Sequence, residues 1–185
     1  MMTIGIDLSI NSTGICVSKN GRYTYYIIAA TATKKLMADC EKHKVNIILY
    51  DKRTVDAKDK YYIREQSKTH NLTTIASHIR DIVKKHKPDM AFIEGISYGS
   101  SSTSNLADLA GLNYLVRSVL TSLGVDIYVV SPKANKHNAT GNGNAGKDLM
   151  IDCWKMCDKK IATLEGKIDD LADAFFLAAT KMEEL

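Results

Sequence analysis

The sequence has few of the features that mark secreted, membrane-spanning or zinc-binding proteins. Its four cysteines form no CxxC pair; Cys153 and Cys157 are spaced for one helix face, but no matching His or Cys pair accompanies them. No basic segment followed by an apolar one precedes the first strand pattern, and no segment approaches the ~20 apolar residues of a membrane span. We therefore expect reduced core thiols in a cytoplasmic protein without a membrane partner, including the cytoplasm of a virus-infected host.

Length and composition are those of one domain able to bury a core. The chain has 185 residues, of which 45% are hydrophobic and 25% are charged. Its formal net charge of +4 suits a nucleic-acid partner without establishing one. We find no internal repeat, and we predict a single domain over residues 1–185, in which residues 31–56 are a candidate small insertion.

Hydrophobic periodicity predicts an α/β order of elements. Strict alternation predicts a first strand over residues 3–10, and Asn20-Gly21 is a two-residue hairpin signal between the next two strands. The remaining patterns predict strands over 15–18, 23–30, 89–96 and 125–130, a short extra strand over 45–50, helices over 58–87, 105–123, 146–157 and 169–182, a helix break near 70–71, and a polar loop over 131–145. Such an order favours a mixed five-stranded sheet, with the first three strands antiparallel and the last two parallel, flanked by helices.

Carboxylates stand where a buried charge is costly. Asp7 lies in an apolar first strand, and Glu94 follows the apolar residues of a core strand. An isolated ionised carboxylate there would cost several kcal/mol, roughly, so each needs a cation or dense hydrogen bonding. Asp169, Asp170 and Asp173 begin the last helix, where the spacing lets two of them share one face.

Each of these carboxylates also has a structural interpretation. The pair at 169–170 could cap the helix, Glu94 could pair with a buried lysine, and Asp7 could accept hydrogen bonds from turn amides. Together, however, carboxylates from two strands and a helix start favour hard, oxygen-ligated cations such as Mg²⁺. Two such ions would activate a water and stabilise the leaving oxygen of a phosphodiester.

The order of the motifs resembles one family. Gly5-Ile6-Asp7, with Thr13-Gly14 closing the turn, is similar to the first-strand motif of the RuvC-type Holliday junction resolvases of the RNase H-like superfamily. Phe92-Ile93-Glu94 resembles the second acidic position of that family, and Asp170-Leu171-Ala172-Asp173-Ala174 resembles its closing D-x-x-D-A helix. Lys136 followed by Gly141-x-Gly143-x-Ala145-x-Lys147 matches its basic loop, which separates this family from other RNase H-like nucleases.

The resemblance implies an RNase H-like fold, junction cleavage by a homodimer, and a set of site residues. Asp7, Glu94, Asp170 and Asp173 would ligate two Mg²⁺ ions, with Mn²⁺ as a substitute. Lys147 would neutralise charge near the scissile phosphate, and Lys133 and Lys136 would face DNA. Asp169 is then a cap or a residue behind the ligands. Tyr98 is the nearest counterpart of the family's aromatic residue at the junction centre; a core or surface tyrosine is the other interpretation.

One departure from the family and three alternatives stay open. Leu8-Ser9 replaces the Pro-Gly usual after the first aspartate, which points to a divergent member such as a viral one. The same carboxylates would serve an RNase H-fold nuclease acting on RNA–DNA hybrids or replication flaps. An actin-like ATPase or sugar kinase also has a similar first strand, but needs about twice this length, and a catalytically dead DNA-binding protein would not need all four carboxylates. Residues 105–123 carry apolar side chains on more than one face, as either a dimer interface or a core helix.

Overall fold

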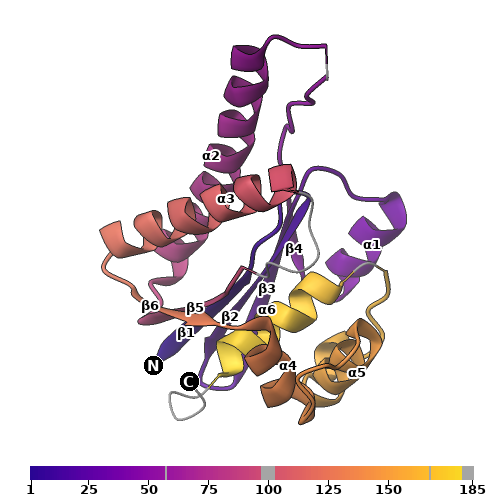
Figure 1. Ribbon diagram of the computed structural model, residues 1–185. Coiled ribbons are helices and arrows are strands. Elements are labelled where there is room, and N and C mark those ends of the chain that lie inside the picture. Colours follow the sequence, from indigo (N-terminus) through magenta and orange to yellow (C-terminus); the bar gives the residue numbers. More distant parts are fainter. Residues whose placement is uncertain (57, 97–102, 167, 181–185) are drawn as a thin grey trace.

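A six-stranded mixed sheet forms the centre of the computed structural model, which describes residues 1–56, 58–96, 103–166 and 168–180. The strand order is β4-β3-β2-β1-β5-β6 (Figure 1). The strands are β1 (Met2–Asp7), β2 (Ser12–Lys19), β3 (Arg22–Ala29), β4 (Asn46–Leu49), β5 (Met90–Glu94) and β6 (Asp126–Val130). Only β2 is antiparallel to its neighbours, and the β1–β5, β5–β6 and β3–β4 pairs are parallel. The carboxyl ends of the other five strands therefore meet at one edge, where sheets of this kind bind their ligands.

Helices cover both faces of this sheet. They are α1 (Lys34–Lys42), α2 (Tyr61–His86), α3 (Thr103–Ser122), α4 (Pro132–Thr140), α5 (Lys147–Cys157), the short 3₁₀ helix η1 (Lys159–Ile161) and α6 (Asp169–Ala179). Helices α2 and α3 pack together on one face, and α6 lies on the other with α4 and α5 beside it (Figure 1). No described helix is long and apolar enough to cross a membrane.

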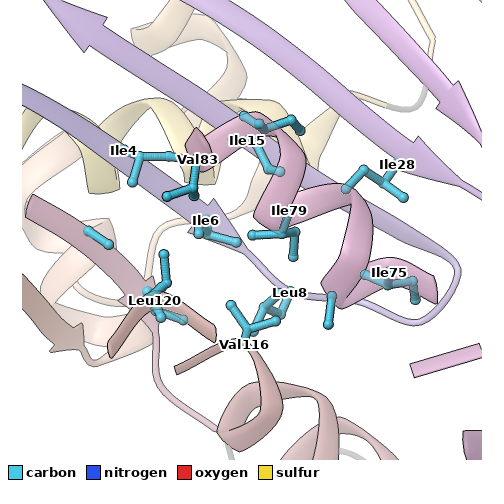
Figure 2. Packing of buried hydrophobic residues seen from close by; sticks show 14 of the residues in the cluster. Ile4, Ile6, Leu8, Ile15, Ile28, Ile75, Ile79, Val83, Val116 and Leu120 are labelled. Carbon is cyan, nitrogen blue, oxygen red and sulfur yellow. The ribbon is translucent and has the colours of Figure 1, made fainter. Parts of the chain in front are cut away.

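The alternation along β1 divides its side chains between two cores. Ile4 and Ile6 are fully buried against α2 and α3, where Ile79 is also fully buried (Figure 2). On the opposite face, the Thr3 hydroxyl donates a 2.7 Å hydrogen bond to the backbone of α6. Because successive strand residues face opposite sides, Asp7 belongs to the α6 face of the sheet.

Two glycines bring α6 into backbone contact with the sheet. A Cβ atom at Gly5 would lie 2.1 Å from the Ala174 carbonyl oxygen, and one at Gly14 would lie 2.1 Å from the Asp170 carbonyl oxygen. No other residue fits without moving backbone, so these glycines set the distance between α6 and strands β1 and β2. The first turn of α6 consequently lies beside the carboxyl end of β1.

The structure corrects the predicted elements in several places. The sheet has six strands rather than five, because the extra strand predicted over 45–50 forms β4 and pairs with β3. Helix α2 is continuous through residues 70–71, since Asn71 is buried and its side chain bonds the backbone of Arg53 instead of capping a break. Cys16 and Cys40 are buried as expected, but Cys157 is exposed and is no core thiol.

The largest error concerns residues 131–145, predicted as a polar loop. Most of this stretch forms α4, which begins at Ser131, whose side chain accepts a hydrogen bond from the Ala134 amide, and continues with Pro132 in its first turn. Gly141, with φ of 76°, ends the helix. The Ser-Pro start and glycine stop are helix signals that the polar composition obscured.

Candidate active site

Four of the predicted carboxylates gather at the carboxyl edge of the sheet. Asp7 is the last residue of β1 and Glu94 the last of β5. Since Ile6 pairs with Ile93 in the parallel β1–β5 register, the two acidic residues come next to each other. Asp170 and Asp173 approach them from the first turns of α6.

The surroundings of Asp7 strongly favour its neutral form. Burial raises the pKa of Asp7 well above its usual value, and repulsion from the Glu94, Asp170 and Asp173 carboxylates raises it further. The protonated Asp7 carboxyl also donates a hydrogen bond to Glu94, which keeps the proton on Asp7. The strand therefore ends on a carboxyl whose charged form needs a cation or a hydrogen-bond donor beside it.

Glu94 and Asp173 share this electrostatic environment. Burial raises the pKa of Glu94 from 4.5 to about 7, with repulsion from Asp173 and Asp170 acting in the same direction. The hydrogen bond from Asp7 and the positive charge of Lys136 oppose this rise. Burial likewise raises the pKa of Asp173 from 3.8 to about 6, again with repulsion from Asp170. These mutual effects show that all four carboxylates lie within electrostatic reach of one another.

Two of the three predicted lysines lie near these carboxylates. Lys136, on α4, interacts with both Glu94 and Asp173 and lowers the pKa of each. Lys147 begins α5 and donates a hydrogen bond to the Asp169 carboxylate, which together with attraction from Asp170 and Asp173 raises the pKa of this lysine.

The other predicted positions have different outcomes. Asp169 does not cap α6, because the N-cap residue is Ile168 and has no side-chain cap bond; Asp169 is buried in the first turn of α6 and pairs with Lys147. Lys133 is exposed in the first turn of α4. Tyr98 lies outside the described residues.

The carboxylates do not form a preassembled cage. Among the described residues, no three His, Cys, Asp or Glu side chains are arranged as a metal site. Asp7 and Glu94 are instead joined by a hydrogen bond. Sharing a proton is how two adjacent buried carboxyl groups relieve their repulsion. The oxygen-only donor set nevertheless has the chemistry that hard divalent cations prefer.

Two buried asparagines that sequence reasoning missed hold the backbone of this site. The Asn113 amide, on α3, donates a 3.1 Å hydrogen bond to the Glu94 carbonyl oxygen. The Asn135 amide, on α4, donates a 3.3 Å hydrogen bond to the Asp173 carbonyl oxygen. Their exposures are 2% and 0%, so neither is a surface amide. Asn113 lies among apolar residues of its helix, and this polar position in a core-facing segment was the available signal.

The turn after Asp7 is closed by a side chain as the sequence suggested. The Thr13 hydroxyl donates a 2.7 Å hydrogen bond to the Ser9 carbonyl oxygen and accepts one of 3.2 Å from the Ser9 amide. These two bonds hold residues 9–13 together directly behind the carboxyl end of β1. Their effect is to restrict the backbone that leaves Asp7.

Comparison with known proteins gives a consistent result. The family model of the crossover junction endodeoxyribonuclease RuvC matches residues 46–181. Curated relatives of that name include one from Brachyspira hyodysenteriae, 30% identical over 118 residues (62% of this chain and 69% of the relative). Another, from Prochlorococcus marinus, is 26% identical over 185 residues, covering 100% of this chain and 98% of the relative.

A solved structure shows the same fold. The structure of T. thermophilus RuvC in complex with Holliday junction substrate superposes with a TM-score of 0.62 at 15% identity, over 96% of this chain and 90% of that one. A mixed sheet with helices on both faces and carboxylates at its edge thus defines a protein of the RNase H-like fold. Within that class, the chain belongs to the RuvC family of crossover junction endodeoxyribonucleases.

Proposed function

We propose that this protein is a divalent-cation-dependent endonuclease that resolves four-way DNA junctions by paired hydrolysis of phosphodiester bonds. The observation that carries the proposal is the mutual interaction of Asp7, Glu94, Asp170 and Asp173 at the sheet edge. Four carboxylates that repel one another at a sheet edge destabilise the fold, and a bound cation would remove this repulsion. The RuvC family, to which the chain belongs, is named for this activity.

The same four carboxylates are the groups that would hold the metal. Mg²⁺ suits them because all the donors are oxygen, and Mn²⁺ is the natural substitute. Bound there, a pair of such ions supplies an activated water and stabilises the leaving oxygen. Because burial and mutual repulsion raise the pKa values of these carboxyl groups, cation binding there would release protons, and the affinity for the cation should rise with pH.

The remaining side chains of the site would neutralise the charge of a DNA phosphate or hold the backbone of the carboxylate residues in position. Lys136 and Lys147 place two positive charges beside the carboxylates, where a DNA phosphate needs compensation. Lys147 is held by Asp169, so its ammonium group stays beside the first turn of α6. Asn113 and Asn135 fix the backbone of Glu94 and Asp173, which limits movement of the carboxylates as charge changes.

Resolution of a junction requires two cuts related by a two-fold axis, so we propose a homodimer as the active assembly. Helix α3 buries Leu112, Val116 and Leu120 within its own chain. On its exposed side Tyr114 is 64% exposed, and the Arg117 guanidinium lies 5.0 Å from its ring centroid. One face of the helix is therefore core, and we propose the exposed face, with Tyr114 and Arg117, as the interface of the homodimer.

The test is to digest an end-labelled four-way junction and an RNA–DNA hybrid side by side in Mg²⁺. We expect symmetric paired nicks near the crossover of the junction. Asp7→Asn should abolish cleavage and retain junction binding, because it removes one oxygen ligand and leaves the phosphate contacts. Asp126→Asn, an exposed carboxylate at the opposite end of the sheet, is the matched control and should cut like the wild type. Degradation of the RNA strand alone, or full activity of Asp7→Asn, would refute the proposal.

A further inference from the structure

A hollow opens at the same edge of the sheet, on the face opposite to the carboxylates. It has a volume of about 540 Å³, within the range of small-ligand sites. Its walls come from the turn after Asp7 (residues 8–11), the segment after β4 (residues 52–55), and helices α2 and α3. The turn at 8–11 therefore separates the hollow from the catalytic edge along the chain.

Positive charge predominates at the hollow. Its lining contains three basic residues and one acidic residue, Asp108. Lys68 is paired with Asp108 at 3.2 Å, which joins α2 to α3 in the lining of the hollow. The Lys52 ammonium group donates a 2.6 Å hydrogen bond to the Asn11 side-chain oxygen, and the Arg53 side chain is exposed, with no ion pair among the residues described. Two of the three cations thus remain available for an anion.

The arginine is held in place by a buried amide. Asn71, 5% exposed, accepts a 2.8 Å hydrogen bond from the Arg53 amide and donates one of 2.9 Å to the Arg53 carbonyl oxygen. The Asn71 side chain thus bonds both backbone polar groups of Arg53, as a neighbouring strand would, and holds the backbone of Arg53 against α2. An arginine on a fixed backbone recognises phosphate better than one on a free loop, because less conformational entropy is lost on binding.

Apolar side chains complete the lining and give it a second chemistry. Leu8, Ile10, Leu72 and Leu109 lie alongside the polar groups. Arg53 also borders a neighbouring hollow on α2, where Tyr61 and Tyr62 are 71% and 58% exposed. The N-terminal half of α2, which carries these tyrosines, projects beyond the sheet (Figure 1). Basic groups beside apolar and aromatic surface are the combination that binds unpaired nucleotides.

We infer that this hollow binds an unpaired nucleotide of the branched DNA, with its phosphate on Lys52 and Arg53 and its base against the apolar wall. The inference rests on the proposed function and adds a strand-holding site to it. A nucleotide held there is connected through the turn at 8–11 to Asp7, so it orients the strand that crosses the catalytic edge. Base pairs at the crossover of a four-way junction open at a lower energetic cost than those inside a continuous duplex, so the site favours junctions over duplex.

The test compares Arg53→Gln with wild type, using fluorescently labelled four-way junction and a linear duplex of the same sequence, in EDTA across a range of salt concentrations. The backbone bonds to Asn71 survive this substitution, so folding is preserved. We expect junction affinity to fall about tenfold, the salt slope to decrease by about one phosphate contact, and duplex affinity to change less than about twofold. Arg22→Gln, an exposed arginine at the far end of β3, is the matched control and should leave both affinities unchanged.

A second variant tests whether the open space of the hollow is needed, rather than its positive charge. Thr54→Trp places an indole at the mouth of the hollow and should weaken junction binding without altering duplex binding, whereas Thr121→Trp on the exposed end of α3 should not. Equal losses on junction and duplex, or junction affinities unchanged in both the Arg53 and Thr54 variants, would overturn the inference. If wild-type protein cleaves junctions while these variants bind them normally, only the nucleotide site fails; if wild type cleaves none, the proposed function fails.

Discussion

Replacement of Glu94 by glutamine should stabilise the metal-free protein, and by an amount that depends on pH. The folded chain raises the pKa of Glu94 from 4.5 to about 7, so between these values the folded state holds a proton that the unfolded state has released. Stability consequently falls as pH rises through this window. At pH 8 the charged side chain costs about 3 kcal/mol, and at pH 5 less than about 1 kcal/mol. Glutamine keeps the shape and removes the charge.

The assay is urea unfolding of wild type and Glu94→Gln in EDTA at pH 5 and pH 8. We expect the variant to be more stable by roughly 2 to 3 kcal/mol at pH 8 and nearly equal to wild type at pH 5. Glu165→Gln is the control, because the Glu165 side chain is 67% exposed in its ion pair with Lys35 and such pairs contribute little. A variant that is destabilised equally at both pH values would show that burial of the charged Glu94 carboxylate, with the repulsion from its neighbours, does not control the stability.

Three further predictions concern the same site. Gly14→Ala should destabilise the protein by more than about 3 kcal/mol in urea unfolding, since its Cβ would lie 2.1 Å from a backbone oxygen of Asp170, whereas Gly146→Ala, with nothing within 4 Å, should cost less than about 1 kcal/mol. Asn113→Leu should lower junction cleavage about 10- to 100-fold and raise the Mg²⁺ concentration needed, with binding in EDTA retained; unchanged cleavage would exclude a positioning role. Mn²⁺ should raise the melting temperature more at pH 8 than at pH 5, because at the lower pH it must displace protons from the carboxylates; an equal shift at both values would contradict this.

Local sequence patterns were sufficient to predict many of the strands and helices, because burial periodicity and turn conformation depend on neighbouring residues. The alternation along β1 reflects two buried faces, and Asn20-Gly21 forms its hairpin because both residues adopt positive φ, 52° and 72°. The position of Asp7 in an apolar strand indicated a site, since burying a charge is costly wherever the strand lies. The cost of burying charge therefore led from the sequence to the four carboxylates, whereas Lys136 and Lys147 were predicted from the resemblance of their segment to the basic loop of the family. The roles of these six residues in catalysis stay predictions that the variants above test.

Other features depended on contacts between distant segments. That β4 adds a sixth strand, that α4 forms where the composition suggested a loop, and that Asn71 serves Arg53 rather than breaking α2 are outcomes of tertiary packing. Sequence determined which side chains carry charge into the core, because side-chain chemistry and periodicity are local properties. Only the tertiary structure decided that those charges lie side by side, which asparagines hold their backbone, and that a basic hollow lies across the same sheet edge, because each depends on the distance between segments far apart in the chain.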